Sequence, residues 1–134
     1  MSASQFPLDF AQLTKDRRPR CFLVLPSGFE STADADMESP VFACEADALL
    51  DQFTSIALSQ ARVSETARND AQREFVQTSA VFKFPDVITV EAVSVDGGFA
   101  LAVYSRAKIG HYDFRVNEKR VRAWIAATAE AISV

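Results

Sequence analysis

What the sequence lacks excludes several classes of protein. No apolar run in its 134 residues approaches the roughly 20 that a transmembrane helix requires, so no membrane-spanning segment is expected. Residues 1–21 contain no uninterrupted apolar stretch of roughly 7 to 15 residues, which a secretory signal needs. We therefore expect a cytoplasmic protein. Its only two cysteines, Cys21 and Cys44, are then expected to stay reduced.

Residues that carry catalysis or bind metal are also scarce. His111 is the only histidine, and Ser105, His111 and Asp113 together supply the residue types of a nucleophilic triad. Ser105 is, however, predicted on the polar side of a strand, without a glycine-rich turn around it. The acidic stretch 34–38, "DADME", lacks the glycine and the distal glutamate of a calcium loop. We predict no catalytic residue, no metal site and no cofactor.

Charge is unevenly distributed along the chain. Lysine and arginine are absent from residues 21–61, which carry seven acidic side chains. Ten of the fourteen basic residues lie in two clusters, residues 15–20 and 106–122. The net charge of −4 and the pI of about 4.9 argue against a nucleic-acid partner. The basic clusters either pair with the acidic stretch or serve an outside partner.

Hydrophobic periodicity predicts an α+β fold. Residues 21–26 and 40–43 are predicted as short strands, and residues 45–60 as a helix with one apolar stripe. Four strands follow, at 63–68, 72–83, 87–95 and 99–108, joined by short turns that make antiparallel neighbours. A last helix begins near Asn117. The prediction is an antiparallel meander of about four strands plus short edge strands, packed on one face by two helices, with residues 1–20 as an N-terminal arm and 21–134 as a single domain.

Turn positions predict which sheet face the helices cover. Centring the last hairpin on Gly97 pairs Val90 with Tyr104 and Ile88 with Arg106. Centring the preceding turn on Pro85 places Phe82 beside Ile88. The predicted helix-covered face is Val76, Thr78, Ala80, Phe82, Ile88, Val90, Ala92, Ala100, Ala102, Tyr104 and Arg106. A one-residue slip would invert this assignment.

The segment from Tyr104 to Trp124 is the strongest candidate for a site. Basic residues in the first turns of the last helix oppose its dipole, so an anion is expected nearby. That anion is Asp113, the acidic stretch, or a ligand carboxylate or phosphate. Asn117 is predicted to cap the helix, and Asp113 to orient Arg106 or accept N–H bonds ahead of Asn117. The candidate ligand-binding residues are Tyr104, Arg106, His111, Asp113, Asn117 and Arg120.

Three motifs carry a family resemblance: "SPVF" before a helix, "FVQTSAVFKFPD", and "YSRAKIGHYDFRVNEKRVRAW". Through them the chain resembles the bacterial and plastid domain-of-unknown-function family 1499, departing from its usual pattern at His111 and Arg115. That resemblance implies no activity. The layout is also similar to compact helix-grip domains, the START-type binders, which hold apolar molecules between a concave sheet and the final helix. This similarity implies a pocket at the same place.

Together these observations favour a non-enzymatic binding module. Its cleft, between the sheet and the C-terminal helix, would take a small anionic or amphipathic ligand. The alternative is a protein-protein or membrane-surface interaction domain that uses the basic edge 106–122. A second alternative is an enzyme of unrecognised type.

Overall fold

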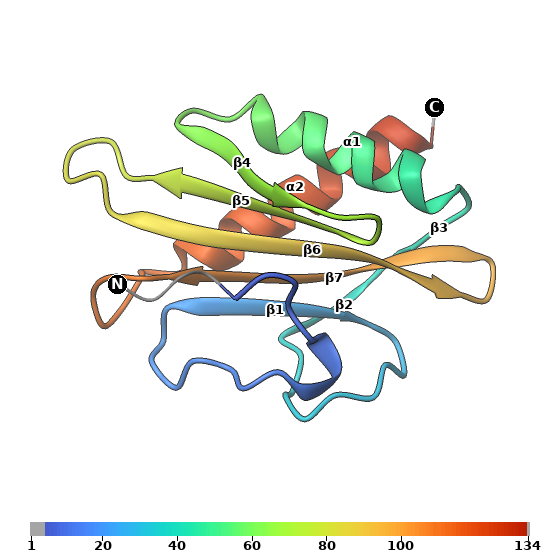
Figure 1. Ribbon diagram of the computed structural model, residues 1–134, viewed down its shortest axis with the longest axis horizontal. Coiled ribbons are helices and arrows are strands. Elements are labelled where there is room, and N and C mark those ends of the chain that lie inside the picture. The colour runs from blue at the N-terminus through green and yellow to red at the C-terminus, as the bar shows by residue number, and fades with distance from the viewer. Residues whose placement is uncertain (1–4, 134) are drawn as a thin grey trace.

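A mixed sheet of seven strands lies at the centre of the structure, a computed structural model that describes residues 5–133. Two helices cover one face of the sheet, and the N-terminal segment crosses the other (Figure 1). The predicted α+β class and the four-stranded meander are therefore confirmed. No helix within residues 5–133 is long and apolar enough to cross a membrane.

The elements follow the predicted order, with one additional short strand. In chain order they are η1 (Phe10–Gln12), β1 (Cys21–Pro26), β2 (Met37–Ser39), β3 (Val41–Phe42), α1 (Ala46–Leu58), β4 (Val63–Arg68), β5 (Gln72–Thr78), β6 (Pro85–Val95), β7 (Gly98–Ala107) and α2 (Val116–Ile132). The sheet order is β2-β1-β7-β6-β5-β4, with β3 also paired to β7. The β1–β2 pair is parallel, and the other pairs are antiparallel.

The larger core lies between the sheet and the two helices. Leu49 and Phe53 of α1 are fully buried at helical spacing, as the stripe predicted. Phe53, Phe75 of β5 and Trp124 of α2 form an aromatic cluster with ring centroids 5.9–6.5 Å apart. Burying side chains of this size supplies most of the free energy of folding.

A smaller core lies on the opposite face. Leu8, Phe10 and Leu13 from the N-terminal segment pack there against Leu23 of β1 and Tyr104 of β7. Residues 5–20 are thus bound to the sheet, and Phe10–Gln12 within them form the short helix η1.

The predicted register of β6 against β7 was wrong by one residue. The turn contains two residues, Asp96 and Gly97, because Val95 pairs with Gly98. Val90 therefore faces Val103 rather than Tyr104. Because side chains alternate along a strand, this slip turns Ala100, Ala102, Tyr104 and Arg106 away from the helices.

The register of β5 against β6 was also wrong. Phe75 pairs with Ile88, and residues 79–84 leave the ladder as a loop. Phe82, predicted in the core, is 72% exposed in that loop. The partner of Ile88 moves from Phe82 to Phe75, a shift by an odd number of residues. Because side chains alternate between the two faces, Val76 and Thr78 also lie off the helix-covered face. Ile88 and Val90 face the helices as predicted.

Candidate functional site

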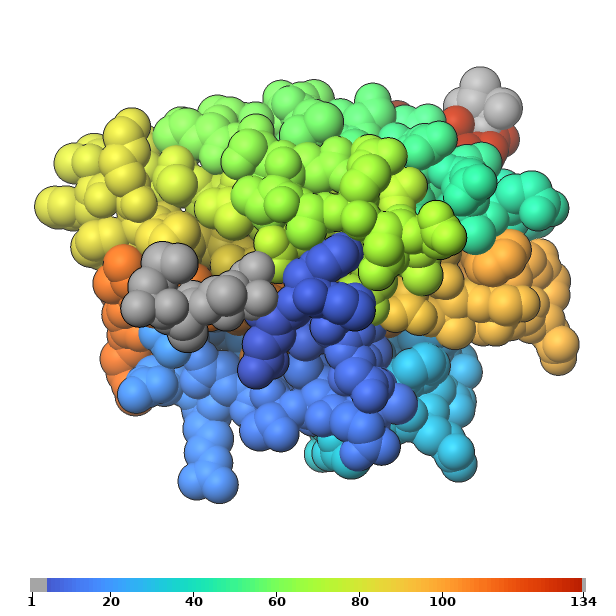
Figure 2. All heavy atoms as spheres, in the orientation of Figure 1, coloured from blue at the N-terminus to red at the C-terminus, as the bar shows by residue number. Residues whose placement is uncertain are grey.

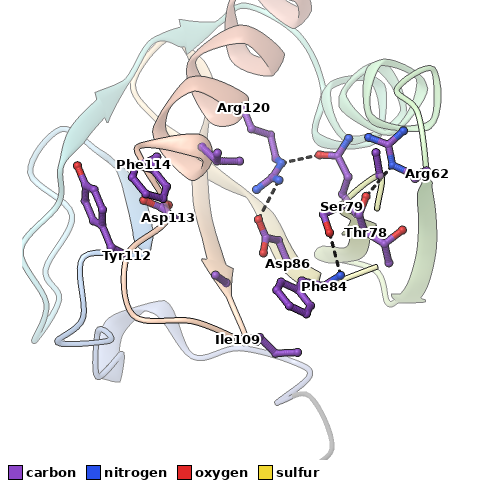
Figure 3. Close-up of a pocket in the computed structure, with 14 residues that line it drawn as sticks. Arg62, Thr78, Ser79, Phe84, Asp86, Ile109, Tyr112, Asp113, Phe114 and Arg120 are labelled. Atoms are coloured by element: carbon purple, nitrogen blue, oxygen red, sulfur yellow. Dashed lines mark hydrogen bonds and ion pairs between the residues drawn. The ribbon is translucent and has the colours of Figure 1, made fainter. Parts of the chain in front are cut away.

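A cleft of about 530 Å³ opens where the ends of β5, β6 and β7 meet the start of α2 (Figure 3). It therefore lies between the sheet and the C-terminal helix, where the sequence analysis expected a pocket. Its walls come from the 79–84 loop, the β7–α2 connection and the α1–β4 connection. The residues that border it are Arg62, Gln77, Thr78, Ser79, Ala80, Phe84, Asp86, Ala107, Ile109, Tyr112, Asp113, Phe114, Val116 and Arg120.

Arg120 and Asp86 form an ion pair inside the cleft (Figure 3). Arg120 Nη2 lies 2.9 Å from Asp86 Oδ2, and both side chains are largely buried. The guanidinium also donates to Gln77, Ser105 and Asn117. A guanidinium carries five N–H groups, so one N–H of Nη2 has no acceptor among the described residues. The pair is chiefly structural, but it leaves one donor at the cleft.

Asn117 is not the helix cap that the sequence predicted. The cap position is Arg115, and Asn117 lies in the first turn with its side chain fully buried. Asp113 Oδ1 accepts from the backbone N–H of Arg115, and Oδ2 from that of Asn117. The prediction that Asp113 accepts N–H bonds ahead of Asn117 is thus confirmed. Asp113 provides an anion at this helix start.

Glu118 provides a second anion in the first turn of α2. It accepts hydrogen bonds from Arg115 Nε and Arg122 Nε, which hold the pKa of the Glu118 carboxyl below its usual range. Two of the basic residues near the helix start are therefore neutralised within the helix itself.

Tyr104 and Arg106 lie on the other face of the sheet, so their predicted convergence with Arg120 was wrong. Arg106 Nη1 donates to Thr89 Oγ1 and to the Tyr104 carbonyl, and its guanidinium stacks 4.9 Å from the Tyr104 ring centroid. Burial lowers the pKa of Arg106. The Tyr104 hydroxyl accepts from the backbone N–H of Asp16, and burial raises the pKa of Tyr104 to about 12. Tyr104 thus anchors the N-terminal segment, and Arg106 supports the Tyr104 ring.

The elements of a nucleophilic triad are not brought together. Ser105 is fully buried and hydrogen-bonded to Asn117, while His111 is exposed in the β7–α2 connection and does not border the cleft. Among residues 5–133, no three histidine, cysteine or acidic side chains gather closely enough to hold a metal ion.

Exposed apolar side chains surround the cleft, which the sequence analysis missed. Of the nine large hydrophobic residues that are exposed in the described chain, seven lie in the 79–84 loop or between Ile109 and Val116. Phe114 is 74% exposed and packs on Tyr112, with ring centroids 4.8 Å apart. Monomeric proteins rarely leave such a group uncovered without a binding role. The available signal was the density of apolar residues in "VFKF", which directly precedes Pro85 and Asp86, and in "IGHYDFRV", which contains Gly110 and Asp113.

The backbone around the cleft is strained. The non-glycine residues with positive φ among those described are Arg62, Lys83, Phe114 and Arg115, with φ between 55° and 64°. They lie in the three connections that form the cleft walls. Left-handed conformations cost about 1–2 kcal/mol for such residues and cluster at ligand sites.

The cleft supplies apolar contact and hydrogen-bond donors rather than a reactive group. Neither cysteine nor histidine borders it, and its two carboxylates, Asp86 and Asp113, are engaged by Arg120 and by the start of α2. The arrangement suits holding a molecule in place. It lacks the pairing of a nucleophile with an adjacent base.

Comparison with known proteins identifies a family but no activity. The model of the family described as "Protein of unknown function (DUF1499)" matches residues 12–128. That match spans β1 to most of α2 and includes every residue bordering the cleft. No curated protein matches the chain.

Proposed function

The chain belongs to the DUF1499 family of proteins of unknown function, and we propose its function from the cleft: it is a non-enzymatic binding module. The cleft holds a small amphipathic, anionic ligand between the sheet and the start of α2. The observation that supports this proposal most strongly is the rim of exposed apolar side chains around a concavity of about 530 Å³. Pockets for small molecules usually measure roughly 300–1,000 Å³ and are mostly apolar with a few polar groups.

The apolar part of the ligand contacts the aromatic side of the cleft. Phe84 and Phe114 stand on different connections and both border the concavity (Figure 3). Phe84 is held in place because its backbone N–H donates to Ser79 Oγ and its ring stacks on Phe82 at 5.4 Å. A preformed apolar wall of this kind binds without a large ordering cost.

The polar end of the ligand lies toward Arg62 and Arg120. Arg62 is exposed, and only its Nε is engaged by a described residue, the carbonyl of Thr78. Arg120 retains one N–H on Nη2, as described above. Arg62 makes no ion pair with a described residue. These donors favour a carboxylate or phosphate head group. A cytoplasmic location is part of this proposal.

Thermal unfolding with three twelve-carbon amphiphiles tests the proposal. Dodecanoate and dodecyl phosphate, used below their critical micelle concentrations, should raise the melting temperature, and dodecyltrimethylammonium should not. A ligand at a hundredfold excess over its dissociation constant adds about 2.7 kcal/mol to the free energy of unfolding. Absence of a shift with both anions would refute the binding module, and an equal shift with the cation would refute the anionic preference.

A matched pair of variants locates the site. Phe114→Ser removes a cleft-wall ring that is 74% exposed, so the fold should survive while the ligand-induced shift falls strongly. Leu58→Ser, at the end of α1, removes another exposed hydrophobic residue that does not border the cleft and should keep the shift. Equal behaviour of the two variants would place binding elsewhere.

A further inference from the structure

Two of the three most exposed large hydrophobic side chains in the described chain form a convex tip beside the cleft. Val81 is 78% exposed and Phe82 is 72% exposed, and neither borders the cleft. Both lie in the 79–84 loop, which projects from one end of the molecule (Figures 1 and 2). The β7–α2 connection lies at the same end, because Asp86 pairs with Ala107 where the two strands meet these loops.

The tip is held in its exposed conformation. The backbone N–H of Ser79 donates to the Phe84 carbonyl, and Ser79 Oγ accepts from the Phe84 N–H, so the base of the loop is closed. Phe82 stacks on Phe84. Hydrogen bonds between Ser79 and Phe84 therefore fix the loop that keeps Val81 and Phe82 exposed to solvent.

Basic residues lie on the three connections at this end of the molecule, in a protein that is acidic as a whole. Lys83 lies within the loop, and Lys108 and Arg62 lie in the connections beside it; none makes an ion pair with a described residue. The nearby acids are already engaged: Asp86 by Arg120, and Asp113 by the start of α2. The net charge of the chain is −4, so these cations are a local exception, and they are available to an anionic partner.

We propose that this end of the protein docks on an anionic lipid bilayer. Val81 and Phe82 enter the interfacial region, while Lys83 and Lys108 meet lipid phosphates. A convex tip needs a matching hollow in a protein partner, whereas a fluid interface accommodates it. Apolar side chains flanked by basic ones are the combination that binds membrane surfaces, because the apolar groups insert and each Lys or Arg is attracted by the anionic lipids.

Vesicle co-sedimentation of the full chain tests the proposal. The protein should sediment with vesicles of phosphatidylcholine and phosphatidylglycerol, much less with phosphatidylcholine alone, and less in high salt. Val81→Ser with Phe82→Ser should weaken binding to the mixed vesicles about tenfold or more, because two apolar side chains are lost. The paired control, Val41→Ser with Leu58→Ser, removes two exposed hydrophobic residues outside the two loops and should bind like wild type.

Three results would overturn the proposal. They are no binding to the mixed vesicles, equal binding by the wild type and the Val81→Ser/Phe82→Ser variant, and equal binding to neutral vesicles. Size-exclusion chromatography adds a fourth: a concentration-dependent dimer that this variant abolishes would make the tip a protein-protein surface. Val81 does not border the cleft, whereas Phe82 stacks on the cleft-wall residue Phe84. The single variant Val81→Ser should therefore weaken vesicle binding and keep the full dodecanoate shift, which separates failure of docking from failure of the binding module.

Discussion

Arg106 and Arg120 belong to one basic segment, yet their environments differ completely. Arg120 reaches across from α2 to Asp86 on β6 and joins four acceptors on different elements. Arg106, buried on the opposite face, is bonded to a threonine hydroxyl and a backbone carbonyl and stacks on Tyr104. A buried charge is costly unless it is paired or hydrogen-bonded. Each arginine meets that condition in a different way, and Arg120 connects the helix to the sheet.

Replacing Arg120 by methionine should lower the free energy of unfolding by about 3–5 kcal/mol, because it leaves the buried carboxylate of Asp86 without its partner. Urea denaturation measures this loss. The neighbouring Lys119 is exposed, so Lys119→Met is the matched control and should change stability by less than about 0.5 kcal/mol. A loss below about 1 kcal/mol for Arg120→Met would show that the pair contributes little to the fold.

At the scale of elements, the start of α2 is the junction that holds the cleft together. Asn117 joins it to three other parts of the chain: its Nδ2 donates to the Arg20 carbonyl and to Asp113, and its Oδ1 accepts from Ser105 and Arg120. Asp113 satisfies the first N–H groups of the helix. The two residues therefore have separate roles, one in the core and one as the cap.

These roles predict different costs of substitution. Asn117→Ala should lower the free energy of unfolding by about 3 kcal/mol, because several buried groups lose their hydrogen-bond partner. Asp113→Ala should lower it by about 1 kcal/mol, the usual cost of a lost cap. Asn117→Asp should also destabilise, because it removes the Nδ2 donor and sets a second carboxylate against Asp113. Chemical denaturation of the three variants measures the order. If Asn117→Asp left the free energy of unfolding unchanged, Asn117 would act as the helix cap after all.

At the scale of the whole molecule, the N-terminal segment covers the sheet face that the helices leave free. The segment is tied down by Gln72, which exchanges hydrogen bonds with the backbone of Leu8, and by the Tyr104 hydroxyl, which accepts from Asp16 N–H. A salt bridge from Lys15 to Asp36 joins it to the residues before β2. Part of the basic cluster at 15–20 therefore pairs internally, one of the alternatives considered for the uneven charge.

The raised pKa of Tyr104 predicts how stability changes at high pH. Burial raises this pKa from 10.0 to about 12, so the neutral phenol is the form that the fold favours. The contribution of this phenol to the free energy of unfolding is complete below pH 10. As the pH rises toward 12 that contribution is lost, a decrease of roughly 2–3 kcal/mol. Tyr104→Phe cannot ionise, so its deficit in unfolding free energy relative to wild type should shrink between pH 9 and 12.

Urea denaturation of wild type and Tyr104→Phe across this range provides the measurement. Between pH 5 and 3 the difference between the two proteins should stay constant, because the phenol does not titrate there, and this range is the control. A difference that stayed constant up to pH 12 would place Tyr104 in contact with water rather than under the N-terminal segment.

Local pattern determined the helices, two strands and the capping carboxylate. The apolar stripes of α1 and α2 follow the helical period, and residues 21–26 and 63–68 form β1 and β4 with the predicted bounds. Asp113 was predicted to accept N–H bonds because it lies just ahead of a helix. Each of these features depends on residues within a few positions of one another, and such short-range relations are written directly in the sequence.

Pairing between strands was decided only by the tertiary structure. The last hairpin can turn on two residues or on three, and this choice decides which face of the sheet Tyr104 and Arg106 lie on. In the same way, either Phe75 or Phe82 could pair with Ile88, and the one that does lies in the core. Both alternatives keep the same alternation of polar and apolar residues, so local pattern cannot choose between them. The choice rests on fitting Phe75 against Phe53 and Trp124, residues brought together from α1 and α2. That packing leaves Val81 and Phe82 outside the core and so creates the exposed tip beside the cleft.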